Sequence, residues 1–146
     1  MILIHCLKHE HKEAWSELWR QYLAFYQTKR DKELFDLTFS RLIDERTECE
    51  GYIAYMDGKA VGIAHCIYHL HLWQKEKTCY LQDLFVDENG RNHGVASKLM
   101  AHVYETADDK KAEGVYWMTQ EFNITAQHLY DKIGVKTPFI KYKRPE

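Results

Sequence analysis

Four stretches of the chain repeat apolar side chains three and four residues apart, the spacing of one face of an α-helix. The residues on these faces are, in chain order, Trp15, Leu18, Trp19, Tyr22 and Tyr26; Phe35, Thr38, Phe39 and Leu42; Val95, Leu99, Val103 and Ala107; and Ala126, Leu129, Tyr130 and Ile133. The pattern predicts four amphipathic helices, of which the first has an unusually aromatic face.

Shorter apolar runs around these helices predict β-strands. They cover residues 2–7, 51–56, 60–71, 80–86, 115–119 and 139–142. Asp57-Gly58 lies between the second and third runs and is a strong signal for a two-residue hairpin turn. The order is β, α, α, three strands, α, β, α, β. We therefore expect an α+β (mixed α/β) fold, with one mostly antiparallel sheet and helices on both faces, and a single domain over residues 1–146.

The composition narrows the class of protein. Of the residues, 45% are hydrophobic and 14% aromatic, as in folded globular proteins. The net charge is −2 and no run of five Lys or Arg occurs, so nothing indicates binding to nucleic acid. No apolar run approaches the roughly 18 residues of a membrane span. The four cysteines are scattered, with no C-x-x-C pair and no secretory leader, which predicts free thiols in a reducing, cytoplasmic compartment.

The stretch from Tyr80 to Met100 reads as a strand, a glycine-containing loop and a helix N-terminus. The loop carries the pattern R-x-x-G-x-A, with Arg91, Gly94 and Ala96. Free amides at a helix N-terminus and the helix dipole together favour a phosphate group, and an arginine suits its oxygens. This indicates a site for a phosphorylated ligand, although an ordinary turn that needs a glycine would look similar.

Two further groups of side chains could serve either packing or function. The aromatic face of the first helix suits core packing, while Tyr22 and Tyr26 could instead line a substrate pocket. His65, His69 and His71 share one face of a strand, but His65 and His71 are roughly 20 Å apart along it and cannot hold one metal ion. No carboxylate or cysteine stands at ligand spacing, so we expect no metal.

Two motifs resemble those of the GNAT superfamily of N-acetyltransferases. R-N-H-G-V-A, at residues 91–96, is similar to the acetyl-CoA signature Q/R-x-x-G-x-G/A in the same strand-loop-helix setting. N-I-T-A-Q-H-L-Y-D-K-I-G-V, from Asn123, is similar to a second motif, N-x-x-A-x-x-L-Y-x-K-x-G-F. The blocks YLQDLFV and GVYWMT further resemble the branch that acetylates polyamines, histones and small amino compounds.

The resemblance implies acetyl-CoA as the co-substrate and a splayed sheet that receives it. Leu84, Phe85 and Val86 would diverge from the strand 115–119 and expose an edge to the pantetheine arm. The amides from Asn92 to Ser97 would hold the pyrophosphate. The implied acetyl-CoA site comprises Leu84, Phe85, Val86, Arg91, Asn92, His93, Gly94, Val95, Ala96, Ser97, Asn123 and Tyr130. Tyr130 would also protonate the departing thiolate, and an amide near Leu84 would stabilise the oxyanion.

The general base is the least determined role. Relatives that acetylate polyamines have Glu-Asp in the central strand, whereas this chain has Gln82-Asp83. Asp83 could act as the base or as an anchor for a cationic substrate, and Glu121 with an ordered water is an alternative. An amine near its working pKa could also lose its proton without a dedicated base. The expected substrate-binding residues are Trp19, Tyr22, Tyr26, Asp83 and Glu121.

The resemblance leaves the acceptor open. We expect an enzyme that acetylates a primary amine of a small molecule, of polyamine or amino-acid type. A protein lysine or N-terminus is a second possible acceptor, and a non-catalytic acyl-CoA-binding module is a third reading. Only twelve residues follow Gly134, enough for one closing strand where many relatives have two. Because an open sheet edge tends to pair, we also expect a homodimer.

Overall fold

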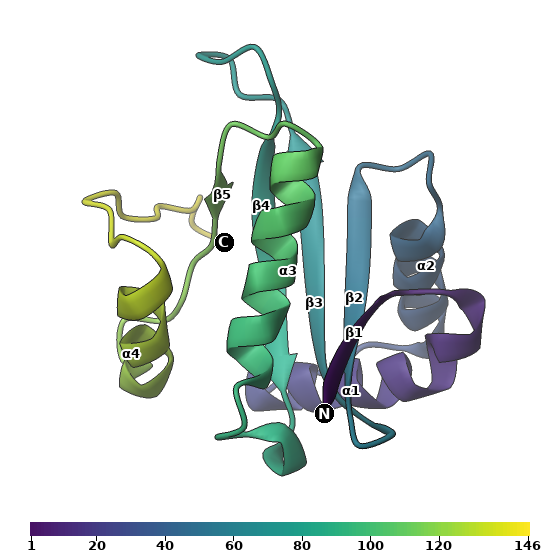
Figure 1. Ribbon diagram of the computed structural model, residues 1–146. Helices are drawn as coiled ribbons and strands as arrows, with labels where there is room; N and C mark the ends of the chain where they lie inside the picture. Colours follow the sequence, from purple (N-terminus) through teal and green to yellow (C-terminus); the bar gives the residue numbers. More distant parts are fainter.

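The computed structural model describes residues 1–146. The elements are, in order, β1 (Ile2–Cys6), η1 (His9–His11), α1 (Lys12–Phe25), α2 (Lys32–Ile43), β2 (Cys49–Met56), β3 (Lys59–His69), β4 (Thr78–Val86), η2 (Glu88–Gly90), α3 (Val95–Asp109), β5 (Val115–Tyr116) and α4 (Ile124–Ile133). The strands form one five-stranded sheet in sequence order, antiparallel from β1 to β4 and parallel between β4 and β5 (Figure 1). The predicted α+β fold is confirmed.

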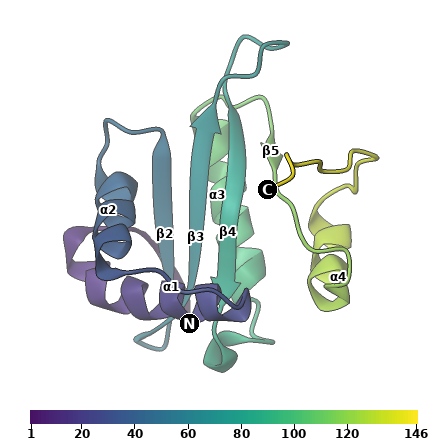
Figure 2. The ribbon, with the colours of Figure 1, turned by 180° about the vertical axis from the view of Figure 1, so that it is seen from behind.

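Helices cover both faces of the sheet. α3 lies across one face, and α1 and α2 lie on the other, as the two opposite views show (Figures 1 and 2). Under α3, Val95, Leu99 and Val103 are almost completely buried against the strands. On the opposite face, Trp15 and Trp19 of α1 and Phe39 of α2 form a second buried cluster. The aromatic face of the first predicted helix is therefore largely a core face.

Local signals explain several element boundaries. Asp31 caps α2, because its side chain accepts a hydrogen bond from the Leu34 amide at 2.9 Å. The predicted hairpin turn has Asp57 at φ 51° and Gly58 at φ 84°, the left-handed backbone that such a turn requires.

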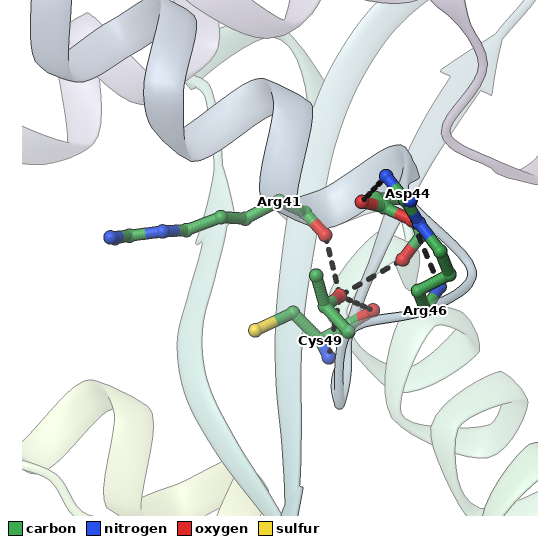
Figure 3. A network of polar contacts seen from close by, with 5 residues as sticks. Arg41, Asp44, Arg46 and Cys49 are labelled. Carbon is green, nitrogen blue, oxygen red and sulfur yellow. Dashed lines mark hydrogen bonds and ion pairs between the residues drawn. The ribbon is translucent and has the colours of Figure 1, made fainter.

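The turn that joins α2 to β2 is held by side chains (Figure 3). The Thr47 hydroxyl donates to the Arg41 carbonyl at 2.7 Å and accepts from the Cys49 amide at 3.2 Å. Arg46 pairs with the Asp44 carboxylate, with Nε 3.0 Å from Oδ1. These contacts replace backbone partners that the end of α2 leaves unsatisfied.

The C-terminal part of the sheet differs from the prediction. The strand expected at 115–119 has only two residues, and the expected strand at 139–142 does not form. Beyond Gly134 the chain is exposed, with Phe139 at 85%, Ile140 at 75% and Tyr142 at 85% of their full accessible surface. A strand needs a partner for its backbone groups. Because β5 leaves the sheet after Tyr116, this edge offers the tail no continuous partner.

The divergence of β5 produces the splay that was predicted. β4 and β5 pair only at Cys79 with Val115 and at Tyr80 with Tyr116. From Leu84 to Val86, the side of β4 that faces away from β3 has no strand beside it, and the chain runs on to α4 instead (Figure 1). The structure has no helix long and apolar enough to cross a membrane.

Candidate active site

The site is organised by an irregularity in β4. His65 pairs with Asp83, and Cys66 pairs with Leu81, so Gln82 is an extra residue in β4. Such a bulge locally changes which way the following side chains point. Here Gln82 is exposed while Asp83 is 9% exposed and lies with His65, on the face covered by α1. The bulge therefore places a buried carboxyl beside the open side of β4.

Asp83 is held by a row of buried hydrogen bonds. The Trp15 indole Nε1 donates to His65 Nε2 at 2.8 Å, and His65 Nδ1 lies 2.7 Å from Asp83 Oδ2. Burial acts to raise the pKa of Asp83, but its hydrogen bond to His65, with contacts to Tyr22 and Trp19, outweighs burial and leaves that pKa below its usual value. Asp83 is consequently a carboxylate in an otherwise apolar setting.

Phenol groups surround this carboxylate. The Tyr22 and Tyr26 rings meet edge to face, with centroids 5.0 Å apart. Burial and the nearby carboxylate of Asp83 both raise the pKa of Tyr22. Tyr80, on β4, stacks on Tyr116 with centroids 4.8 Å apart. The predicted substrate residues Tyr22, Tyr26 and Asp83 are thus brought together.

The other two predicted substrate residues lie differently. Trp19 is 7% exposed and stacks on Trp15 with centroids 5.2 Å apart, so it belongs chiefly to the core. Its indole also lies beside the Asp83 carboxylate, although Nε1 is buried without a hydrogen-bond partner. Glu121 is exposed in the turn before α4, and only its backbone carbonyl is bonded, by Gln127 Nε2 at 2.9 Å. No contact links Glu121 to Asp83.

The loop between β4 and α3 has the features that were expected of an anion site. Gly94 begins α3 at φ 82° without a side-chain cap, and the amides of residues 91–97 donate no hydrogen bond within the chain. Asp87 holds the start of the loop in place, because its buried carboxylate accepts a hydrogen bond from the Gly90 amide at 3.1 Å. Free amides at the positive end of a helix dipole are the donor set that a pyrophosphate requires.

Side chains of the same loop leave donors available. Arg91 Nε lies 3.4 Å from the Val86 carbonyl, and its terminal nitrogens donate to no other group. His93 Nδ1 lies 2.7 Å from the Arg91 carbonyl. Val95 is buried between α3 and the sheet, whereas Asn92, Gly94 and Ser97 are exposed. The residues present therefore fit the phosphate end of acetyl-CoA.

α4 carries the last two predicted site residues, Asn123 at its start and Tyr130 within it. Asn123 caps the helix, with Oδ1 3.2 Å from the Ala126 amide, and its side-chain nitrogen has no partner in the chain. Tyr130 packs edge to face on Trp117, with centroids 5.4 Å apart. Burial, with a smaller effect of Tyr26, raises the pKa of Tyr130, so its phenol stays protonated at neutral pH.

The histidines considered for a metal serve other contacts. His65 bonds Asp83, whereas His69 Nε2 lies 2.7 Å from the Tyr116 hydroxyl and His71 Nδ1 accepts from the Trp73 amide at 3.2 Å. No group of three His, Cys, Asp or Glu side chains is arranged to hold a metal ion. The sequence pattern did not reveal His65 as the partner of Asp83, nor Trp15 as the donor to His65, although His65 and Asp83 stand on neighbouring strands of the predicted meander.

Comparisons with known proteins agree with this geometry. The sequence profile of the Acetyltransferase (GNAT) family matches residues 11–135. The D-amino-acid N-acetyltransferase HPA3 of Saccharomyces cerevisiae is 38% identical over 145 residues, which cover 98% of this chain and 90% of that protein.

Two solved structures share the fold at low identity. AAC(6')-Iy, in complex with the bisubstrate analogue CoA-S-monomethyl-acetylneamine, has a TM-score of 0.86 at 19% identity, over 100% of this chain and 99% of its own. The ribosomal-protein-alanine N-acetyltransferase of Brucella melitensis biovar Abortus 2308 has a TM-score of 0.81 at 18% identity, over 100% of both chains. With the family profile and the yeast relative, the expectation from the two motifs is confirmed, and the chain belongs to the GNAT family of acetyltransferases.

Proposed function

We propose that residues 1–146 form one catalytic domain that transfers an acetyl group from acetyl-CoA to a primary amine of a small molecule. The observation that carries this proposal is the arrangement along β4. Its unpaired edge begins beside a buried carboxylate, Asp83, and leads to the free amides of residues 91–97. β4 and the loop that follows it therefore connect a candidate cation site, Asp83, to a candidate pyrophosphate site, the amides of residues 91–97.

The chain's own residues have distinct roles in this proposal. Bound acetyl-CoA would supply a thioester. The substrate amine would lose its ammonium proton to solvent and attack the thioester carbon as a neutral amine; the C–S bond would break as the C–N bond forms, and the second proton of the nitrogen would also pass to solvent. The edge from Leu84 to Val86 and the side chain of Asn123 would hold the pantetheine arm. An amide at Leu84 would donate to the oxyanion. Tyr130 would give its proton to the sulfur, since its phenol is protonated at neutral pH.

For Asp83, we propose the role of anchor rather than that of base. A carboxylate whose pKa is lowered is a weak proton acceptor, but it attracts an ammonium group strongly in a buried setting. The phenols of Tyr22 and Tyr26 add aromatic faces that suit a cation. We therefore assign Asp83 to binding of the substrate's ammonium group, with Tyr22 and Tyr26 as neighbouring walls.

The acceptor amine is proposed to be of amino-acid or polyamine type. The yeast relative is named for D-amino acids, which supports the first of these two classes. Thiol release from acetyl-CoA, measured with a panel of free amino acids of both hands, polyamines and lysine-containing peptides, tests the proposal. Turnover with small amines supports it, turnover with peptides alone would move the acceptor to proteins, and binding of acetyl-CoA without any turnover would overturn it.

Gly94→Ala is expected to weaken acetyl-CoA binding roughly tenfold. Gly94 has a φ of 82°, a left-handed conformation in which a Cβ costs about 1–2 kcal/mol. Relief of that strain would turn the first amides of α3 away from the pyrophosphate. Isothermal titration with acetyl-CoA measures the effect.

Gly58→Ala is the matched control, because Gly58 has a φ of 84° and, like Gly94, no heavy atom within 4 Å of an added Cβ. Both variants should lose similar thermal stability, but Gly58→Ala should bind acetyl-CoA as the wild type does. Equal affinity in the two variants would remove Gly94 from the proposed pyrophosphate site.

We also propose that the protein is a homodimer, built on the open edge left by β5. Val135 is 91% exposed and Phe139 85% exposed, which is costly for apolar side chains in water. Sedimentation should give twice the 17.5 kDa mass of one chain. Phe139→Ser with Ile140→Ser should shift the protein toward monomer, whereas Leu72→Ser, at a residue 93% exposed elsewhere, should not. A wild-type monomer at high concentration would contradict the proposal.

A reducing compartment such as the cytoplasm is our proposed location. Cys6, Cys49, Cys66 and Cys79 are all free thiols. The thiols of Cys66 and Cys79 lie in contact inside the core, where the hydrogen bond between them and then burial raise the pKa of Cys66. Free thiols of this kind are typical of proteins kept under reducing conditions.

A further inference from the structure

Trp15, His65 and Asp83 form a row of buried hydrogen bonds. The proposed reaction uses Asp83 but gives no role to Trp15 or His65. Trp15 is 0% exposed, His65 4% and Asp83 9%. The two contacts that join them are short, at 2.8 Å from Trp15 Nε1 to His65 Nε2 and 2.7 Å from His65 Nδ1 to Asp83 Oδ2. Each member comes from a different element, α1, β3 and β4.

The chemistry of the indole group determines the state of the histidine. An indole N–H can only donate, so His65 Nε2 must accept and carries no proton. The proton of the neutral ring is then on Nδ1, which donates to Asp83 Oδ2. A second proton on His65 would be on Nε2, where its N–H would point at the N–H of the Trp15 indole. Both donors would then be buried without an acceptor, which costs the free energy of desolvating an unsatisfied group.

We propose that Trp15 and His65 are positioning residues that keep the site's net charge at −1: Trp15 holds His65 as the neutral Nδ1–H tautomer, and His65 orients Asp83 without neutralising it. A protonated His65 would form a charge-compensated pair with Asp83 and would leave nothing to attract a cation. With a neutral partner, the carboxylate keeps its charge. His65 commits Oδ2, which leaves Oδ1 for an ammonium group. The role of Asp83 toward an ammonium group rests on the proposed function, whereas the tautomer of His65 does not.

The other groups that face Asp83 reinforce this charge state. Tyr22 from α1 and Tyr80 from β4 are its titratable neighbours beside His65, and burial raises the pKa of each phenol, as does the charge of Asp83. Both phenols are therefore neutral at neutral pH. The indole of Trp19 also lies beside the carboxylate. Apart from His65, no basic side chain of the chain pairs with Asp83.

The first test is the nitrogen spectrum of the His65 ring, recorded by NMR on the wild type and on Trp15→Phe. We expect the wild-type ring to carry its proton on Nδ1 alone at pH 7, because the indole N–H of Trp15 occupies Nε2. Trp15→Phe removes the N–H donor, so His65 should then take up a second proton as the pH falls. A wild-type ring that is doubly protonated at pH 7, or protonated at Nε2, would overturn the inference.

The second test measures steady-state kinetics on the same proteins. In Trp15→Phe, the KM for the amine should rise roughly tenfold toward acid pH, as expected for the loss of a charge-assisted contact, while the affinity for acetyl-CoA stays unchanged. Trp73→Phe, at an indole 90% exposed in the β3–β4 loop, is the matched control and should behave as the wild type. A KM that is equally dependent on pH in wild type and Trp15→Phe would contradict the role of Trp15.

Two variants of His65 keep the inference testable if Trp15→Phe does not fold. His65→Gln retains an N–H donor toward Asp83, and His65→Leu removes it. In His65→Leu, loss of the N–H donor should raise the pKa of Asp83 and so move the acid limb of the kcat/KM profile to higher pH. In His65→Gln, the retained donor should make this shift smaller. Identical profiles for the two variants would count against the positioning role. Absence of turnover with any amine would sink the proposed function, while the wild-type nitrogen spectrum would still decide the tautomer.

Discussion

Asp83→Asn should lower kcat/KM for the amine roughly 100-fold, because a charge-assisted hydrogen bond in a buried site is worth about 1.5–3 kcal/mol. The loss should appear mainly in KM, since an anchor binds the ground state and the transition state alike. The side-chain oxygen of asparagine can still accept from His65 Nδ1, which lies 2.7 Å from Asp83 Oδ2, so the fold should survive. Steady-state kinetics with the best amine, together with a thermal unfolding curve, measure both effects.

Glu121→Gln separates this assignment from the alternative acid. Glu121 is exposed in the turn before α4 and has no contact with Asp83, so its kinetics should be close to those of the wild type. If Glu121→Gln lost activity and Asp83→Asn did not, the anchor would have to be moved to the turn before α4. A loss in kcat alone for Asp83→Asn would instead favour the role of base.

The fold could be predicted because its strongest signals are local. Periods of three and four residues identified the helices, and Asp57-Gly58 identified the hairpin, since both depend only on neighbouring residues. The strand expected at 139–142 failed for the opposite reason. Its apolar pattern was suitable, but a strand also needs a partner, and β5 ends at Tyr116. Whether such a partner exists is decided by distant parts of the chain.

In the candidate site too, features set by neighbouring residues could be predicted, whereas features set by distant parts of the chain could not. Arg91, Gly94 and Ala96 could be found from sequence, because a loop and the helix after it contain the whole pattern. The partnership of His65 with Asp83 could not, because the extra residue Gln82 shifts the register between β3 and β4. Without the bulge, the residues that face each other cannot be assigned. Glu121 was predicted from its chemistry alone, and the turn before α4 leaves it exposed.

Tyr130→Phe should reduce kcat by roughly 100-fold, the lower end of the range for removal of a general acid, because a thiolate is a good leaving group. The KM for the amine should change little, since Asp83 remains. The phenol can serve as the acid because it is protonated at neutral pH, and burial raises its pKa further. Thiol release at saturating amine and acetyl-CoA measures kcat directly, and the acetyl-CoA affinity of the variant shows whether the site is intact.

Tyr104→Phe is the matched control for this experiment. Tyr104 lies on α3, donates its hydroxyl to the Ile133 carbonyl at 2.7 Å, and has its ring centroid 6.3 Å from that of Trp117, the residue on which Tyr130 also packs. The same loss of one hydroxyl should therefore disturb the packing of α4 without removing an acid. A large fall in kcat for Tyr130→Phe and a small one for Tyr104→Phe would identify proton transfer. Equal losses would assign Tyr130 to packing, and the thiolate would then have to take its proton from solvent.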